Sequence, residues 1–154
     1  PPVGVMVEVP AAISQLKFWA RYIDFVSIGS NDLSQYLLAI DRNNPKLTQQ
    51  FDHVHPAVIA ELARVVSTCS QLDLPVCVCG EMASEPVSLI LLFALGIRKL
   101  SVSSSKIPRL KSLISKLDRQ VASEFLAFAL EAESTELIRA EGQRLLAEIK
   151  HKVA

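Results

Sequence analysis

The stretch that decides the fold is PVCVCGEMASEPVSLILLFALG, residues 75–96. Its first five residues have the composition of a buried strand, and Gly80 ends that strand. Pro86 then begins a helix, because proline fits the first helical turn, and Gly96 ends it. Since the helix sequence LILLFAL is apolar all round, we expect this helix to be buried. The stretch therefore predicts one complete strand-then-helix unit.

Further units of the same kind surround this stretch. Other strands are predicted at residues 3–7, 25–28 and 99–103, and helices are predicted to begin at Pro10, at Ser30 or Asp32, at Pro56 and at Pro108. Strands that alternate with helices in this way run parallel and are joined by right-handed crossovers. The fold class predicted from the sequence is therefore α/β.

The spacing of apolar residues predicts which helix faces are buried. Ser30 or Asp32 is expected to cap the second helix, and Phe18 and Trp19 are expected to pack in the core or between helices. The other expected core positions are, in chain order, Ile13, Leu16 and Ala20; Leu33, Tyr36, Leu37 and Ile40; Val58, Ile59, Leu62, Val65, Val66 and Cys69; Ile107, Leu110, Leu113, Ile114 and Leu117; and Leu137, Ile138, Leu145, Leu146 and Ile149.

The number of strand-then-helix units limits the size of barrel that the chain can form. A complete (β/α)8 barrel of the TIM type takes about 250 residues, so four units in roughly 118 residues amount to half of one. We therefore expect residues 1–118 to be the second half of such a barrel and residues 119–154 to be a helical extension, broken near 131–134. A small doubly wound sheet is the alternative, but the glycine fingerprint of nucleotide-binding sheets is missing. The start without Met, and without a signal peptide, predicts a piece of a longer protein.

Composition excludes several kinds of partner. Sixteen Lys and Arg balance sixteen Asp and Glu, which leaves no basic surplus for nucleic acid. The longest apolar run, residues 89–95, is too short to span a membrane. The three cysteines fit no C-x-x-C pattern, and Cys77 and Cys79 point the same way from one strand, a poor geometry for a disulfide. These features predict a reducing, cytoplasmic location.

Polar side chains follow the predicted strands at the point where each strand ends. They are Glu8 after the first strand, Asn31 and Asp32 after the second, Cys79, Gly80 and Glu81 at the third, and Ser103, Ser104 and Ser105 at the fourth. Because parallel strands end on the same face, these groups should meet there. Two carboxylates without His or Cys partners suit Mg²⁺ or Mn²⁺. Singly, Glu8 and Asp32 also fit acids at helix starts, but together they favour a metal site.

Other candidates have two interpretations each. Arg42 either reaches back to bind a phosphate with its planar guanidinium or pairs with Asp41 or Asp52 at the surface. Cys79 is either a small buried apolar residue or a proton donor to a carbanion-like carbon. His53, His55 and His151 are not expected to be catalytic, and His55 is expected to mark the entry of the helix at Pro56.

Three ordered motifs carry a resemblance to a known family. GVMVEVPAA (4–12), SIGSNDLSQYLLAIDRNN (27–44) and VCVCGEMASEP (76–86) resemble the C-terminal part of the phosphoenolpyruvate (PEP)-binding barrel of PEP-utilising enzymes. The likeness is greatest to enzyme I of the bacterial phosphotransferase system, a PEP-protein phosphotransferase. The segment SQYLLAIDRNNP (34–45) is similar in sequence to the nitrogen-related paralogue of enzyme I.

The resemblance implies a role for each matched residue. Glu8 and Asp32 match the Mg²⁺ ligands, Asn31 matches a PEP-binding residue, Arg42 a phosphate-binding arginine, and Cys79 the acid that protonates the enolate as pyruvate forms. The phosphoryl group would pass to a histidine on a separate N-terminal domain, and from there to a histidine-phosphocarrier protein, in a homodimer. Because that domain and the first barrel half lie outside these 154 residues, we expect this chain to be inactive alone.

Three other interpretations remain open from the sequence. PEP synthase and pyruvate phosphate dikinase share the barrel and the Asn-Asp motif. Mg²⁺-dependent aldolase-type lyases also use a Glu and an Asp on successive strands, although they have no use for Cys79. The third alternative is a dimerisation module without activity of its own.

Overall fold

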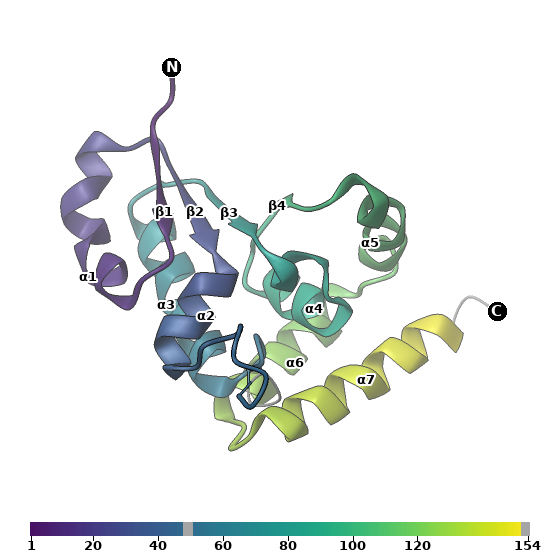
Figure 1. Cartoon of the computed structure of the whole chain (residues 1–154). Helices are drawn as coiled ribbons and strands as arrows, with labels where there is room; N and C mark the ends of the chain where they lie inside the picture. The colour runs from purple at the N-terminus through teal and green to yellow at the C-terminus, as the bar shows by residue number, and fades with distance from the viewer. Residues whose placement is uncertain (48–50, 152–154) are drawn as a thin grey trace.

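The structure of the chain, a computed structural model, describes residues 1–47 and 51–151. Its centre is a four-stranded sheet of β1 (Gly4–Val7), β2 (Phe25–Gly29), β3 (Val76–Cys79) and β4 (Lys99–Ser101). The strands lie in chain order, β1-β2-β3-β4, and each neighbouring pair is parallel (Figure 1). The predicted α/β fold class is confirmed. The fourth strand ends two residues before the predicted 103.

The helices follow the predicted order. They are α1 (Pro10–Trp19), α2 (Ser30–Leu38), α3 (Pro56–Gln71), α4 (Pro86–Ala94), α5 (Ile107–Ile114), α6 (Arg119–Glu131) and α7 (Thr135–His151). Short 3-10 turns precede or follow them at η1 (Ala20–Tyr22), η3 (Glu81–Ser84) and η4 (Ser104–Lys106). Pro10, Pro56 and Pro86 each begin a helix as predicted, and α6 and α7 are separate helices. The side chain of His151 lies outside the described residues.

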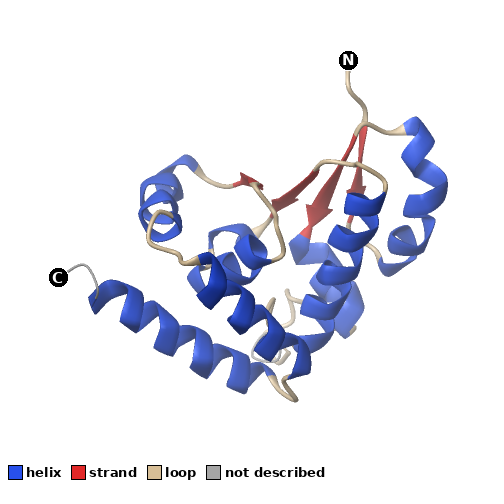
Figure 2. Ribbon diagram, turned by 180° about the vertical axis from the view of Figure 1, so that it is seen from behind, coloured by secondary structure: helices blue, strands red, loops and turns tan. Residues whose placement is uncertain are grey.

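Helices cover one face of the sheet and leave the other face open. One face carries paired residues that are fully buried, namely Val7, Ile28 and Val78. Helix α3 lies across this side, in front of the strands in Figure 2. The other face carries a second row of paired residues, Met6, Ser27, Cys77 and Lys99. Met6 is 48% exposed, and in Figure 1 no helix lies in front of β1 and β2. This face therefore has no cover within residues 1–47 and 51–151.

Helix α4 is buried all round, as its sequence predicts. Every residue from 87 to 92 is at most 1% exposed. Helix α7 approaches α4 closely at Gly142, where an added Cβ would lie 2.4 Å from Cγ1 of Val87 and 3.0 Å from Cζ of Phe125. Only a residue without a side chain fits at this crossing. The C-terminal extension is therefore packed firmly onto the α/β part of the chain.

Helix α2 differs from the prediction at both ends. Gly29 precedes the helix and no side chain caps it, so the cap predicted at Ser30 or Asp32 is wrong. Ser30 is instead the first helical residue, and its hydroxyl donates to the carbonyl of Cys79 at 2.7 Å. Ala39 adopts a left-handed conformation with φ 53°, which ends the helix before Ile40.

Several residues that were predicted to be buried are exposed. They are Phe18 (63% exposed), Tyr36 (55%), Leu137 (49%) and Ile107 (40%). Leu137 and Ile138 are neighbours about 100° apart around a helix, so only one of them can face the core, and Ile138 does. In α2 the buried partner of Leu33 is Ser34 rather than Tyr36. No helix in the described part of the chain is both long and apolar enough to cross a membrane.

Candidate active site

A cavity of about 230 Å³ opens at the carboxyl ends of β1, β2 and β3. Its lining consists of Met6, Glu8, Gly29, Ser30, Asn31, Asp32, Cys79 and Gly80. Four of the five predicted site residues therefore line one cavity, although they come from three separate strand ends. The cavity lies on the face of the sheet that carries Met6 and Ser27, which the helices leave open.

Glu8 lies over the end of β2 because Gly29 leaves room for it. A Cβ at position 29 would come within 3.0 Å of Cβ and 3.1 Å of Oε2 of Glu8. Glu8 does not cap α1, since the residue preceding that helix is Val9 and no side chain caps it. Glu8 lies two residues before Pro10, the first residue of α1, and its side chain lines the cavity.

Asn31 connects the second strand end to the third. Its Oδ1 accepts a hydrogen bond from the backbone N–H of Glu81 at 2.9 Å. Gly80, with φ 98°, allows this approach, because a Cβ there would lie 2.8 Å from Oδ1 of Asn31. Since the oxygen is used by Glu81, the side-chain NH₂ group of Asn31 is the part that remains for a ligand.

The thiol of Cys79 lies at the open face of the sheet. Its Sγ is 3.4 Å from the carbonyl oxygen of Ile28 and 3.8 Å from Sδ of Met6. Ser27 Oγ is 3.9 Å away. Cys79 and its neighbour Cys77 are both free thiols, as the poor disulfide geometry predicts. All three contacts involve sulfur and are weak hydrogen bonds.

Arg42 returns to the site from the loop after α2. Its Nη2 is 3.2 Å from Oδ1 of Asp32, and its backbone N–H donates to Oε1 of Gln35 at 3.2 Å. The left-handed Ala39 turns the chain back toward the start of α2. Arg42 thus contacts Asp32, a residue of the cavity wall.

The serines after β4 do not join the cavity. Ser103 and Ser105 instead bond to each other, Oγ to Oγ, at 2.8 Å, and neither lines the cavity. The short β4 and the η4 turn direct this segment away from the other strand ends. The expectation that these hydroxyls join the site is therefore wrong for this chain.

His53 and His55 form hydrogen bonds to other parts of the chain. His55 caps α3, because its Nδ1 accepts the N–H of Ala57 at 3.1 Å, which confirms its predicted place at the helix entry. His53 is only 7% exposed, and its Nδ1 is 3.1 Å from Oγ of Ser34. Burial lowers the pKa of His53 below its ordinary value. The sequence offered no pattern that would pair His53 with Ser34.

The donor atoms of the cavity suit a hard cation. Within residues 1–47 and 51–151, no group of three or more His, Cys, Asp or Glu side chains is arranged to hold a metal. Glu8 and Asp32 alone offer two carboxylates. Mg²⁺ is bound in many proteins by one or two carboxylates and by oxygens of the substrate and water, so this pair fits Mg²⁺ better than zinc or copper.

Comparison with known proteins identifies the family. A family model described as "PEP-utilising enzyme, PEP-binding domain" matches residues 1–119. The chain belongs to this family. The resemblance inferred from the three sequence motifs is thereby confirmed, and the match covers all the residues that line the cavity.

Named relatives agree with this family. The chain is 41% identical over 144 residues to a multiphosphoryl transfer protein of Xanthomonas campestris pv. campestris, with 93% of the chain and 17% of the relative covered. It is 35% identical over all 154 residues to a protein of Escherichia coli named "Phosphoenolpyruvate-dependent phosphotransferase system", covering 19% of it. A phosphoenolpyruvate-protein phosphotransferase of Cupriavidus necator is 44% identical over 112 residues, 73% of the chain and 19% of the relative. The chain thus spans less than a fifth of these relatives.

Proposed function

We propose that this chain is the C-terminal, PEP-binding part of a longer PEP-protein phosphotransferase of the enzyme I type. The observation that supports this most directly is the gathering of Glu8, Asn31, Asp32 and Cys79 around one cavity in a chain of the PEP-binding family. The names of the relatives support phosphoryl transfer rather than aldol cleavage. The sequence of residues 34–45 favours the nitrogen-related paralogue.

The sheet supports the proposal that these residues are half of a (β/α)8 barrel. The strands are parallel and in chain order, and β1 and β4 are its two edges. The open face carries Met6, Ser27 and Cys77, which would point into the barrel once further strands close it. Residues 1–118 would then be the second half of the barrel and residues 119–154 its helical extension.

Glu8 and Asp32 would hold a Mg²⁺ ion together with oxygens of PEP. The ion would supply positive charge that orients the phosphate and offsets charge that develops during transfer. Asn31 would donate from its NH₂ group to the substrate, and Arg42 would bind the phosphate through its planar guanidinium. Each of these donors lies beside the cavity or in direct contact with a residue that lines it.

The transfer itself needs a histidine on another domain. A nitrogen of that histidine would attack phosphorus, and the bond between phosphorus and the enol oxygen would break with its electron pair on oxygen. The resulting enolate would take a proton on its methylene carbon from Sγ of Cys79, which gives pyruvate and leaves a thiolate that solvent reprotonates. A histidine-phosphocarrier protein would then accept the phosphoryl group.

We place this enzyme in the cytoplasm as a homodimer, and the free thiols Cys69, Cys77 and Cys79 suit a reducing compartment.

Replacement of one cysteine tests this assignment. In the full-length enzyme that carries this chain, Cys79→Ala should lower pyruvate formation from PEP by about 10²- to 10⁴-fold, the usual contribution of a general acid. PEP binding should persist, because the thiol only donates a proton. Cys77→Ala is the matched control, since Cys77 lies on the same face of the same strand but does not line the cavity. Normal turnover by the Cys79 variant would overturn the assignment.

A further inference from the structure

The guanidinium of Arg139, on the C-terminal helix α7, connects two loops of the α/β part. Its Nε and Nη2 donate to the two carboxylate oxygens of Asp52, at 2.8 and 2.5 Å. Its Nη1 lies 2.9 Å from Oε1 of Glu85. One side chain thus binds the loop that precedes α3 and the segment that leads into α4.

The contact with Glu85 leads to the active site along η3. Glu85 directly follows η3, and its carboxylate caps α4 by accepting the N–H groups of Val87 at 3.1 Å and Ser88 at 2.7 Å. The other end of η3 is Glu81, whose N–H donates to Oδ1 of Asn31. Four residues therefore separate the Arg139 contact from the cavity wall.

The contact with Asp52 leads to the same site by another route. Asp52 also accepts the N–H of Val54 at 2.9 Å, which fixes the loop around His53. The buried His53 is bonded to Ser34, which lies in α2 one turn after Asn31. The first route therefore ends at Asn31 and the second at Ser34, three residues further along α2.

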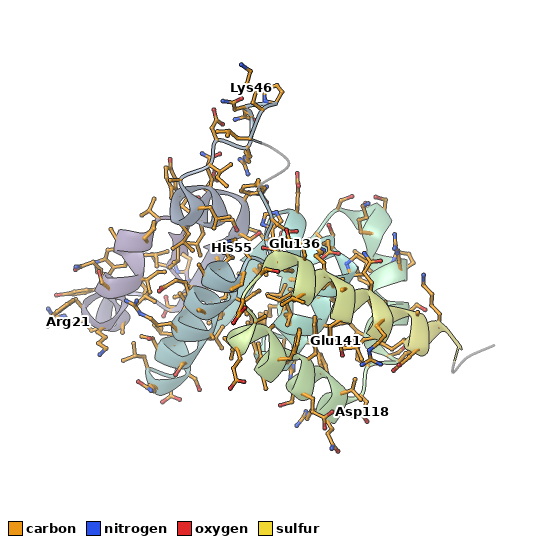
Figure 3. The ribbon with its side chains drawn as sticks, turned by 90° about the horizontal axis from the view of Figure 1, so that it is seen from below. Arg21, Lys46, His55, Asp118, Glu136 and Glu141 are labelled. Carbon is orange, nitrogen blue, oxygen red and sulfur yellow. The ribbon has the colours of Figure 1, made fainter. Side chains whose placement is uncertain are left out.

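The first turn of α7 lies beside the same loop. Figure 3 shows His55, at the start of α3, close to Glu136, at the start of α7, and the charges of His55 and Asp52 both act on Glu136. Gly142, one turn after Arg139, allows α7 to pack directly on Val87. The close packing at Gly142 thus restricts the position of α7 one turn from Arg139.

We propose that Arg139 is a positioning residue for the PEP site, because it closes a ring of four side-chain contacts and the short chain segments between them. The contacts join Arg139 to Glu85, Glu81 to Asn31, Ser34 to His53, and Asp52 to Arg139. This proposal rests on the proposed function. Arg139 lies 20 residues beyond the end of the family match at 119, so the helical extension, and not only the PEP-binding part, contributes to the site. The ring is half-buried, with side-chain exposures of 28% for Arg139, 22% for Asp52 and 29% for Glu85. Its ion pairs are therefore less screened by water than surface pairs.

The test compares two arginines of α7 in the full-length enzyme. Arg139→Met removes the ring contacts, whereas Arg144→Met removes pairs with Glu141 and Glu148 that stay within α7. Hydrogen exchange should become at least severalfold faster at residues 30–34 and 81–84 in Arg139→Met, with the sheet unchanged. The KM for PEP should rise in the same variant. Arg144→Met should leave both measurements as they are.

Two further variants test the role of Arg139, and one outcome would overturn it. Arg139→Lys keeps the charge but not the two-pronged bond to Asp52, so we expect an intermediate exchange rate. If Arg139→Met does not fold, Asp52→Asn replaces it and should accelerate exchange at residues 30–34. Unchanged exchange at both segments, or an equal rise throughout the chain, would overturn the proposal. Because exchange is measured without PEP, this outcome is distinct from a failure of the proposed function.

Discussion

Nη2 of Arg42 lies 3.2 Å from Oδ1 of Asp32, so the proposed phosphate-binding arginine is paired with a proposed metal ligand. The side chains of Arg42 and Asp32 are 33% and 40% exposed, and the pair closes the loop after α2 onto the start of that helix. A divalent cation held by Asp32 would repel the guanidinium and favour its turn toward the substrate phosphate. We therefore propose that this pair couples binding of the metal to binding of the phosphate.

Replacement of Arg42 should weaken PEP binding without loss of the metal. A hydrogen bond between charged groups contributes about 1.5–3 kcal/mol, so Arg42→Met should raise the Kd for PEP by roughly 10- to 100-fold in the full-length enzyme. Mg²⁺ affinity without PEP should stay the same or increase, because a positive charge beside Asp32 is removed. Arg64→Met is the control, since Arg64 pairs with Glu61 on the surface of α3. Calorimetric titrations that give equal Kd values for PEP would contradict this role.

The buried His53 should make stability fall in mild acid. Its pKa is lowered mainly by burial, against the opposing charges of Glu81, Asp52 and Glu85 and with the help of Arg139. As pH falls through the unfolded value near 6.5, the unfolded chain binds a proton that the folded chain does not. The contribution of the neutral, buried His53 to the free energy of unfolding should therefore be complete above that pH, and the free energy of unfolding should decrease below it.

Denaturant unfolding between about pH 7.5 and about pH 5.5 measures this effect. His53→Asn can still bond to Ser34 but does not titrate in this range, so the decrease in unfolding free energy should be smaller in the variant. An equal decrease in both proteins would show that His53 is not the titrating group.

Sequence reasoning predicted those parts of the fold that depend on local patterns. The all-apolar residues 89–95 between Pro86 and Gly96 predict a buried helix, and α4 is buried because no face of it is polar. The meeting of Glu8, Asn31, Asp32 and Cys79 was predictable too, because parallel strands bring their carboxyl ends to one face.

Other features depend on conformations or distances that the sequence does not reveal. The return of Arg42 requires Ala39 in a left-handed conformation, which alanine rarely adopts. The pair of Arg139 and Asp52 joins residues 87 apart, and no short pattern relates them. The cap predicted at Ser30 or Asp32 failed because the Ser30 hydroxyl bonds to Cys79 across the sheet instead.

The 154-residue chain alone should associate with itself and bind PEP poorly. The edges β1 and β4 leave backbone groups unpaired, and the exposed Met6 lies on the uncovered face of the sheet. The phosphate-binding groups of the first barrel half would also be missing. Sedimentation should show dimers or larger species at micromolar concentration, and calorimetry should show weak or no PEP binding. A stable monomer would contradict the first expectation, and tight Mg²⁺-dependent PEP binding the second.

We propose that Glu8 and Asp32 hold the divalent cation to which PEP binds. Calorimetric titration of PEP into the full-length enzyme, with and without Mg²⁺, tests this most directly in Glu8→Gln, Asp32→Asn and the control Glu124→Gln, whose side chain is exposed on α6. Each site variant loses a charged oxygen ligand, so we predict that Mg²⁺ strengthens PEP binding in the unsubstituted enzyme and the control, and that this gain falls at least about 10-fold in both site variants. An undiminished gain from Mg²⁺ in Glu8→Gln and Asp32→Asn would contradict the account.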